Sequence, residues 1–476
     1  MSEVIIEKTE HEVVAELIEK AKVAMDQIKD YTQEQANELV KAAAWAIYKQ
    51  DHAETLAEIS VRDTGLGKYE DKVSKNQRKT LGCLRDLMDP SAKSVGILQE
   101  DPEKGLIEYA KPVGVVAAVC PSTNPAATPA NKVMFSLKSL NAVILSPSPK
   151  GVSSCEKYVE YVHAELSKIG APLDLVQMIP APVSKAKTLE LMQQADFIAL
   201  TGSANNIKMA QTSGTPNVCV SAGNVVTVVD ASADLKDSAH KITLSKIFDH
   251  ATSCSSDNAV VIEEAVYDDM IAALIAEGGY MCNAAEKDAL QKALWDPETG
   301  KRRGATTCKA PDIIAKEAGF TSDEALSAKF FMVEETNYGK EYPFSSEKLA
   351  VVLTVYKAKD FEEALDITEG VLNVKGRGHS CGLHTTNKDH IYEIGKRMKV
   401  CRLMINQAQC FANGGNFDNC MNFTLSMGGG TWSGNNIKEN LNYKHFFQTT
   451  KVSMPIPAVT PDIADYLGEY WDKYGK

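Results

Sequence analysis

The stretch GVVAAVCPSTNP, residues 114–125, decides the fold of this chain. Its first half is a short apolar run, and its second half is a loop in which two prolines fix the backbone. Further short apolar runs lie at residues 141–146, 197–201 and 225–229, with helix-like stretches between them at 130–140 and 155–169. Continuous apolar strands that alternate with helices predict an α/β fold with a wound parallel sheet covered on both faces.

The chain before this stretch is predicted to be helical. Apolar residues keep helical spacing at Val14, Leu17, Ile18, Ala21, Ala24, Met25 and Ile28. Thr32 and Gln35 have the spacing of a capping box, in which each side chain satisfies a free backbone amide at a helix start. Residues 36–48 then continue as an amphipathic helix.

A second α/β set is expected to begin near Asp230. Its predicted strands lie at residues 260–262, 330–333 and 350–356. Residues 286–304 are charged, and we expect a solvated connection there. The tail from Gly428 onward is rich in Asn, Tyr and Phe and has little helical period, which favours strands packed against a neighbouring subunit.

The composition indicates a globular protein with more than one lobe. The chain has 476 residues, of which 44% are hydrophobic and 24% charged, and a single core rarely supports that length. The net charge of −12 argues against nucleic acid as a partner, because binding to phosphates draws on basic patches. No apolar run reaches the roughly 18 residues of a membrane span, and the acidic N-terminus does not resemble a signal peptide. We therefore expect a cytoplasmic protein.

One of the eleven cysteines stands out by its neighbours. The cysteines form no Cys-x-x-Cys pair and no group with His at zinc-site spacing, so we interpret them as reduced thiols and expect no metal site. Cys254, however, lies among small polar residues in DHATSCSSD at 249–257, just ahead of an apolar run. A thiol in that setting stays partly exposed and open to ionisation or attack.

Four other loops hold side chains suited to chemistry. Asn124 lies in the loop after the first strand, and its amide is a good donor to an oxyanion. Lys150 follows the strand at 141–146, at the edge where wound sheets bind ligands. Small residues at 201–203 let backbone amides approach a pyrophosphate, although the Gly-x-Gly-x-x-Gly fingerprint is absent. His379 lies in a glycine-rich loop and can exchange protons near neutral pH.

Taken in order, these motifs resemble the aldehyde dehydrogenase superfamily, and more narrowly its coenzyme A-acylating branch. The motifs that carry the resemblance are Thr123-Asn124-Pro125, Gly223-Asn224, Cys254-Ser255-Ser256, Glu347-Lys348, Gly378-His379 and Glu439-Asn440. The resemblance implies a Rossmann-like domain for a nicotinamide nucleotide at residues 1–230. It further implies an α/β catalytic domain at 231–425 and a β-rich oligomerisation segment at 426–476, in a homodimer or homotetramer.

The resemblance also implies roles for individual residues. Cys254 would be the nucleophile, Asn124 and a backbone amide near Cys254 would hold the oxyanion, and His379 would lie near the acyl group. The nucleotide site would be formed by Ser122, Thr123, Ser146, Lys150, Gly202, Ser203, Ser221 and Glu347. Ser148 and Val351 replace residues that relatives usually carry there, which leaves NAD and NADP both open.

One absence bears on the reaction. Hydrolytic members carry Glu-Leu-Gly-Gly-Lys where this chain reads SAGN at residues 221–224, so the carboxylate that activates water is missing. Coenzyme A needs no such base, because its thiolate is itself a strong nucleophile. The sequence thus favours an acyl-coenzyme A product. The alternatives are a hydrolytic aldehyde dehydrogenase, a glutamyl phosphate reductase-like enzyme that releases phosphate, and a non-catalytic binding descendant of the family. The presence of Cys254 and Asn124 argues against the non-catalytic descendant.

The residues around the nucleophile suggest the substrate class. We expect the substrate pocket to be polar if the residues that line it are Thr252, Ser253, Arg377, Gln409 and Asn413. Such donors suit a short anionic aldehyde, and residues 413–419 look closer to succinate semialdehyde and sulfoacetaldehyde enzymes than to acetaldehyde enzymes. Our first expectation is sulfoacetaldehyde, converted to sulfoacetyl-coenzyme A, with succinate semialdehyde and acetaldehyde as alternatives.

Overall fold

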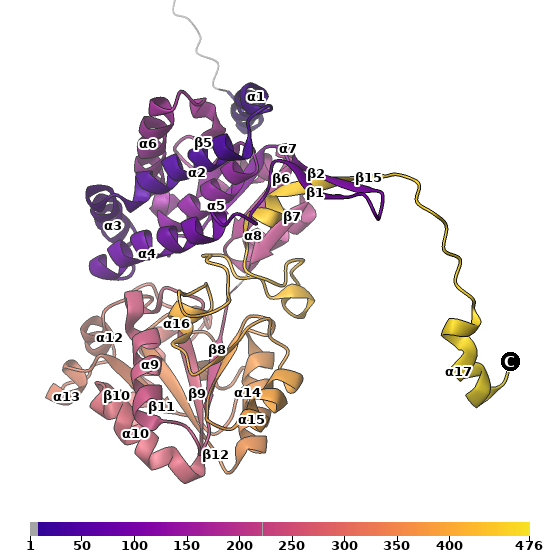
Figure 1. Ribbon diagram of the computed structural model, residues 1–476. Coiled ribbons are helices and arrows are strands. Elements are labelled where there is room, and N and C mark those ends of the chain that lie inside the picture. Colours follow the sequence, from indigo (N-terminus) through magenta and orange to yellow (C-terminus); the bar gives the residue numbers. More distant parts are fainter. Residues whose placement is uncertain (1–7, 221) are drawn as a thin grey trace, which may run out of the picture.

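The computed structural model, which describes residues 8–220 and 222–476, has two α/β lobes and a projecting arm (Figure 1). The first lobe contains a five-stranded parallel sheet in the order β5-β4-β3-β6-β7. Its strands are β3 (Val116–Cys120), β4 (Val143–Pro147), β5 (Val176–Met178), β6 (Phe197–Thr201) and β7 (Asn217–Val220). Three of these are the predicted apolar runs, whereas β5 and β7, with three and four residues, are too short to stand out in the sequence.

The helices of the first lobe cover this sheet. They are α1 (Glu10–Ile28), α2 (Gln33–Tyr48), α3 (Gln50–Thr64), α4 (Tyr69–Leu87), α5 (Ala127–Lys138), α6 (Val152–Lys168), α7 (Lys185–Gln194) and α8 (Ala204–Thr212). The predicted capping box at Thr32 and Gln35 opens α2. Every residue of α5 is buried, because α2 and α4 pack over it while it contacts β3 and β4. This second helical layer brings α4 close to the loop that follows β3.

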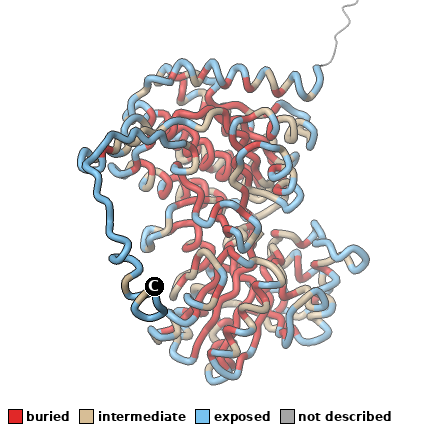
Figure 2. The backbone as a smooth tube through the Cα atoms, turned by 90° about the vertical axis from the view of Figure 1, so that its right-hand side faces the viewer, coloured by how far each residue is buried: buried red, intermediate tan, exposed pale blue. Residues whose placement is uncertain are grey.

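The second lobe contains a seven-stranded parallel sheet in the order β10-β11-β12-β9-β8-β13-β14. Its strands are β8 (Val225–Val229), β9 (Asp257–Glu263), β10 (Gly279–Met281), β11 (Phe330–Glu334), β12 (Val352–Ala358), β13 (Cys381–His384) and β14 (Leu403–Ile405). Val226 and Val228 of β8 face one apolar core, and Val229 faces another. Both faces of the sheet are therefore buried, as its continuous apolar strands predict (Figure 2).

The boundary between the two sheets differs from the sequence expectation. The second set was expected to begin near Asp230, but β8 already pairs with β9 and β13 of the second sheet. An apolar run shows that a strand is buried on both faces and does not show which sheet it joins. The chain therefore passes from the first sheet to the second between Val220 and Val225.

Helices also cover the second sheet. They are α9 (Leu235–Ile247), α10 (Tyr267–Ala276), α11 (Ala284–Leu294), α12 (Pro311–Glu317), α13 (Asp323–Leu326), α14 (Phe361–Val374), α15 (Lys388–Arg397) and α16 (Gln409–Ala412). The expected solvated connection at 286–304 is wrong in its first half, because α11 buries Leu290 and Leu294 against the core. Short 3-10 helices are η1 (Pro149–Gly151), η2 (Leu173–Leu175), η3 (Phe248–Ala251), η4 (Glu264–Val266), η5 (Pro343–Ser345), η6 (Gly430–Ser433) and η7 (Tyr443–Phe446).

The arm is a three-stranded antiparallel sheet that projects from the first lobe (Figure 1). It is built from β1 (Gly96–Asp101), β2 (Leu106–Pro112) and β15 (Phe447–Ser453), so a C-terminal strand pairs here with a hairpin from the first quarter of the chain. The tail then leaves both lobes and ends in α17 (Ala464–Tyr474). The sequence analysis predicted strands for this tail, which is correct for β15 but not for α17. The helix has a signal in the sequence, because Tyr466, Tyr470 and Tyr474 have helical spacing. No described helix combines the length and the apolar character that crossing a bilayer requires.

Candidate active site

Cys254 is presented by a strained turn between α9 and β9. Three successive non-glycine residues have positive φ: Asp249 (49°), His250 (49°) and Ala251 (58°). Such angles cost roughly 1–3 kcal/mol each and persist only where surrounding contacts enforce them. The turn leaves Cys254 partly exposed, whereas most of the other cysteines are buried. The expected partial exposure is confirmed, whereas the expected ease of ionisation is not, because the pKa of this thiol is raised to about 12.

The contacts that enforce this turn come from α4. The Asp249 carboxylate accepts hydrogen bonds from the backbone amide of Lys68 (2.8 Å), from Lys72 Nζ (3.1 Å), and from Lys75 Nζ and Thr252 Oγ1. Burial alone would raise the pKa of Asp249, but the two lysines outweigh it and hold that pKa at about 2. Asp249 is therefore an anion that ties the nucleophile turn to the helical layer of the first lobe.

His379 is in hydrogen-bond reach of the nucleophile. Its Nε2 lies 3.2 Å from Cys254 Sγ, and its Nδ1 lies 2.7 Å from Ser380 Oγ. Burial, and then the Arg402 cation, lowers the pKa of His379 to about 3. Burial, and then the Glu347 carboxylate, raises the pKa of the Cys254 thiol to about 12. At neutral pH the resting pair is a thiol and a neutral imidazole, and the imidazole is placed to accept the thiol proton during attack.

Asn124 is oriented by Lys75. The Lys75 ammonium donates to Asn124 Oδ1 at 2.7 Å. An ammonium has no acceptor, so this contact fixes the carbonyl end of the amide toward α4. The Asn124 NH₂ group is thereby left as the donor for other partners. Lys75 was missed in the sequence, although Lys72, Lys75 and Lys79 follow the i, i+3, i+7 spacing of one buried helix face.

A cavity of about 250 Å³ brings eight of the predicted residues together. It is lined by Pro121, Thr123, Asn124, Thr128, Thr201, Gly202, Ser203, Val220, Ala222, Thr252, Ser253, Cys254, Arg302, Glu347, Leu349, Leu425 and Met427. Its residues come from both lobes, so the reactive thiol lies where the carboxyl ends of the first sheet face the nucleophile turn.

The loop at residues 222–224 packs directly on the nucleophile. A Cβ added at Gly223 would lie 2.0 Å from the carbonyl oxygen of Cys254, so only glycine fits there. Gly223 N also donates to Glu347 Oε1 at 3.2 Å. Glu347 is the one carboxylate among the described lining residues, and Arg302 (3.3 Å) and Lys375 (3.2 Å) pair with it. Ser221 lies outside the described residues.

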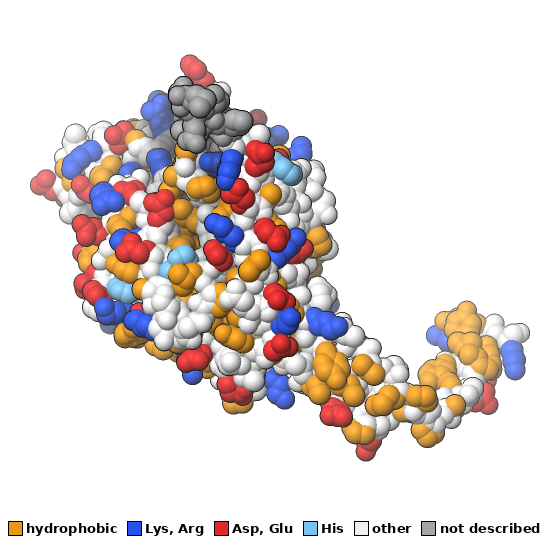
Figure 3. Space-filling model, turned by 90° about the horizontal axis from the view of Figure 1, so that it is seen from above, with side chains coloured by type: hydrophobic (Ala, Val, Ile, Leu, Met, Phe, Trp, Pro, Cys, Tyr) orange, Lys and Arg blue, Asp and Glu red, His pale blue; other side chains and the backbone are white. Residues whose placement is uncertain are grey.

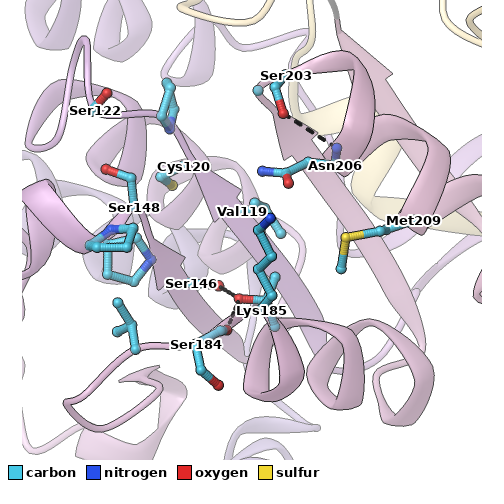
Figure 4. A pocket seen from close by; sticks show the side chains of 16 residues that line it. Val119, Cys120, Ser122, Ser146, Ser148, Ser184, Lys185, Ser203, Asn206 and Met209 are labelled. Carbon is cyan, nitrogen blue, oxygen red and sulfur yellow. Dashed lines mark hydrogen bonds between the residues drawn. The ribbon is translucent and has the colours of Figure 1, made fainter. Parts of the chain in front are cut away.

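A second cavity, of about 290 Å³, opens at the carboxyl ends of β3, β4 and β6 (Figure 4). It shares Pro121, Gly202 and Ser203 with the first cavity, so the two adjoin. The other lining residues are Val119, Cys120, Ser122, Ser146, Pro147, Ser148, Pro149, Val183, Ser184, Lys185, Thr188, Asn206 and Met209. Hydroxyl groups and the start of α8, whose first turn is capped by Ser203 (Figure 4), suit a phosphorylated nucleotide.

Some predicted residues lie elsewhere. Lys150, next to the lining residue Pro149, is exposed on η1 and does not line the nucleotide cavity, and Arg377 is exposed in its loop. Gln409 and Asn413 are buried and bond to each other, with Asn413 Nδ2 2.7 Å from Gln409 Oε1. Neither lines the cavity of Cys254. The reason is α16, which turns both side chains inward.

The match to known proteins agrees with this geometry. Residues 4–282 match the model of the aldehyde dehydrogenase family. The chain is 48% identical to an acylating sulfoacetaldehyde dehydrogenase of Cupriavidus necator, over 98% of this chain and 94% of that protein.

The chain belongs to the aldehyde dehydrogenase family.

Two further relatives place it within that family. It is 36% identical to an acetylating succinate-semialdehyde dehydrogenase of Clostridium kluyveri, over 92% of this chain and 95% of that protein. The crystal structure of an acetylating aldehyde dehydrogenase from Geobacillus thermoglucosidasius superposes with a TM-score of 0.90 at 31% identity, covering 95% of this chain and 98% of that one. The expected aldehyde dehydrogenase fold is thus confirmed.

Proposed function

We propose that this aldehyde dehydrogenase oxidises sulfoacetaldehyde to sulfoacetyl-coenzyme A and reduces a nicotinamide nucleotide. The observation that carries the proposal is a thiol beside a neutral imidazole, in a cavity whose one carboxylate among the described lining residues is paired with two cations. A carboxylate held in that way is a poor base for water. The likeness to the sulfoacetaldehyde enzyme of Cupriavidus necator supports the choice of aldehyde.

In the first half-reaction, Cys254 Sγ forms a bond to the aldehyde carbon, and the thiol proton passes to His379 Nε2. The aldehyde oxygen becomes an alkoxide, which the Asn124 NH₂ group stabilises. When bound, the nicotinamide supplies the hydride acceptor. Collapse of the alkoxide restores the carbonyl as the C–H bond of the former aldehyde carbon breaks and its hydride leaves, so a thioester remains on Cys254.

In the second half-reaction, His379 has returned its proton to solvent and accepts the proton of the coenzyme A thiol. The thiolate of coenzyme A then forms the new carbon–sulfur bond, and the bond to Cys254 breaks. Cys254 leaves as a thiolate and regains a proton from His379. The overall change converts aldehyde, coenzyme A and oxidised nucleotide to acyl-coenzyme A, reduced nucleotide and one proton.

We further propose that the nucleotide is held by Ser122, Ser146, Ser148 and Ser203, with Thr123 and Glu347 on the side of the nicotinamide. The nucleotide cavity has Lys185 and no carboxylate among its described lining residues. NAD sites often bind the ribose hydroxyls through a carboxylate, whereas a cation accommodates the 2′-phosphate of NADP. This difference favours NADP, and comparison of kcat/KM for NAD and NADP in wild type and Lys185→Met tests it.

We also propose a homo-oligomer in the cytoplasm, where its unpaired thiols would stay reduced. The tail exposes Ile456, Val459, Ile463, Tyr466, Tyr470 and Tyr474. Figure 3 shows hydrophobic side chains gathered along the projection that extends from the body of the molecule. Apolar groups at this density usually meet a partner surface, and a second copy of the chain supplies one.

The test of the proposed function is nicotinamide reduction with sulfoacetaldehyde, succinate semialdehyde and acetaldehyde, each with and without coenzyme A. We expect strict dependence on coenzyme A and the highest kcat/KM for sulfoacetaldehyde. Equal rates without coenzyme A, with free acid as product, would contradict the acylating reaction. A higher kcat/KM for acetaldehyde than for both anionic aldehydes would contradict the substrate.

The matched variants are Cys254→Ala and Cys420→Ala. Cys254→Ala should abolish turnover while nucleotide binding, followed by fluorescence titration, persists. Cys420 is exposed and lines neither the cavity of Cys254 nor the nucleotide cavity, so its replacement should leave turnover intact. Turnover of Cys254→Ala above a few per cent of wild type would remove Cys254 from the mechanism.

A further inference from the structure

A small third cavity shares a wall with the cavity of Cys254. Asn124, Ser253 and Leu425 line both. The other lining residues of the small cavity are Lys75, Arg78, Lys79, Phe248, Cys410 and Phe411. Its volume is about 30 Å³, enough for roughly one to three water molecules. The space therefore suits a compact head group directly beside the aldehyde carbon, and not a long chain.

The charge around this cavity is one-sided. Three cationic side chains line it, and none of its described lining residues is Asp or Glu. The nearby Asp249 is already shared between Lys72 and Lys75. Buried charge without a counter-charge is unfavourable, so an uncompensated cation beside a reactive centre points to an anionic ligand. This positive site exists in a chain whose net charge is −12.

Arg78 has the most donors to offer. Its guanidinium lies over the rings of Phe411 (5.1 Å) and Phe423 (5.7 Å), which hold it half-buried. Within the described part of the chain, its one side-chain hydrogen bond is a donation to Asn416 Oδ1. The exposed Asp418 carboxylate acts on it electrostatically but forms no ion pair with it among the described residues. An arginine carries five N–H donors in a fork that matches planar or tetrahedral oxyanions.

The neighbouring cations are placed differently. Lys79 Nζ donates to the carbonyl oxygen of Gly414 at 2.7 Å, which anchors the loop after α16. Lys75 is occupied by Asn124, Asp249 and Thr252. Both add positive potential to the cavity while their donors serve the protein. Arg78 is therefore the group free to make direct contact.

We propose that Arg78, in the field of Lys75 and Lys79, binds the sulfonate of the aldehyde and thereby sets the preference for sulfoacetaldehyde. This inference rests on the proposed function and names the residues that read the anion at the same site. One methylene separates the sulfonate from the aldehyde carbon, so a carbonyl at Cys254 and Asn124 leaves the sulfonate next to Ser253. Acetaldehyde leaves the cations unpaired, and the longer succinate semialdehyde overfills the cavity. The exposed Arg377 has no part in this contact.

The decisive quantity is the ratio of kcat/KM for sulfoacetaldehyde to kcat/KM for acetaldehyde, both with coenzyme A. We expect Arg78→Met to lower this ratio at least 100-fold, mainly through KM for sulfoacetaldehyde, since loss of one partner of a desolvated charge pair has effects of that order. Arg78→Lys should recover part of the loss, because it restores the charge and not the fork. An equal loss for both aldehydes would overturn the proposal.

Arg85 is the matched control. It lies on the same helix and contacts the same ring of Phe423 (4.8 Å), but it pairs with Asp86 at 2.8 Å and does not line the cavity. Arg85→Met should leave the ratio unchanged. A drop of similar size in Arg85→Met would mean that Arg78 acts through packing of the helix, and the proposal would fall.

Inhibition provides a readout that is independent of turnover of the sulfonate. Ethanesulfonate should compete with acetaldehyde in the wild type, 1-propanol at the same concentration should not, and Arg78→Met should weaken the inhibition at least tenfold. If Arg78→Met does not fold, ethanesulfonate inhibition is compared between the wild type and Arg78→Lys instead. Absence of ethanesulfonate inhibition overturns the anion site while coenzyme A-dependent turnover still stands, so the two failures are distinguishable.

Discussion

At the scale of single residues, the contact between Cys254 and His379 makes a prediction about pH. His379→Ala removes the proton acceptor, and we expect kcat near pH 7 to fall roughly 10²–10⁴-fold, the usual contribution of general base catalysis. With the thiol pKa at about 12, the thiolate fraction of the variant rises tenfold per pH unit. Log kcat of His379→Ala should therefore rise with a slope near one between about pH 7 and 10, and the wild type should show no such slope.

The control for this variant is His384→Ala. His384 is also buried, on strand β13, and among the described residues the hydrogen bond of Cys254 Sγ is to His379 and not to His384. Its replacement disturbs packing without removing the base, so its pH profile should match that of the wild type. A flat profile in His379→Ala would show that another group takes the thiol proton.

A second residue, Lys79, makes the preference for the anion depend on pH. Burial, and then the nearby Arg78 cation, lowers the pKa of Lys79 to about 7. The groups that face it are Arg78, Lys75 and Cys83 on α4 and Cys410 on α16. Lys79 is charged below about pH 7 and neutral above it, so the positive potential falls as pH rises.

The expected result is a decline in the ratio of kcat/KM for sulfoacetaldehyde to that for acetaldehyde between pH 6 and 8.5. We expect this ratio to fall roughly three- to tenfold, which is the effect of losing one partly screened charge. Taking the ratio cancels any pH effect common to both aldehydes, and kcat/KM reports the free enzyme. Lys79→Met should give a ratio that does not change with pH, and a decline in that variant would exclude Lys79 as its source.

At the scale of elements, α4 and the turn η3 depend on Asp249 for their attachment. Asp249→Asn leaves Lys72 and Lys75 buried without a counter-charge, and breaking such a pair on one side costs about 3–5 kcal/mol. Urea unfolding should show this loss, whereas Asp237→Asn, an exposed partner of Lys241, should change stability by less than about 0.5 kcal/mol. Loss of similar size in both variants would contradict a special role for Asp249.

The contribution of Asp249 to the stability of the fold should depend on pH in one direction. The folded pKa of Asp249, about 2, lies below its ordinary value of 3.8. The carboxylate therefore contributes stability that is fully present above about pH 4 and is lost as pH falls toward 2. Wild type should lose stability across this window, and Asp249→Asn should lack that part of the loss.

The sequence predicts those features of the site that depend on residues adjacent in the chain. Cys254 and Asn124 could be identified because each follows or precedes a strand end, where loops of wound sheets face a ligand. Lys75 and Arg78 could not be linked to the site, since they reach it only because α4 packs over α5 and against η3. Gln409 and Asn413 were expected at the substrate for their polarity, but the orientation of α16 is a tertiary property.

At the scale of the whole molecule, the arm and tail lead us to predict that copies of this chain associate. Strand β15 pairs with β2 as an edge strand of the arm, and beyond Ser453 the described tail adds one backbone hydrogen bond, from Met454 N to Gly105 O (2.7 Å), but no further strand. Its apolar side chains are nevertheless exposed, with Val459 at 89% and Tyr466 at 70%. A chain that keeps so much apolar surface outside its own core is best stabilised by burying it against another copy.

Deletion of residues 456–476 tests this assembly. We expect the truncated protein to keep its circular dichroism spectrum, because both cores lie outside the deleted segment, and to shift to a smaller species in light scattering. Deletion of residues 475 and 476 alone, which spares α17, should leave the mass unchanged. An unchanged mass after the longer deletion would place the subunit contact elsewhere. Because residues of both lobes line the cavity of Cys254 within one chain, the smaller species should retain coenzyme A-dependent turnover, and loss of turnover on dissociation would mean that a neighbouring subunit completes the site.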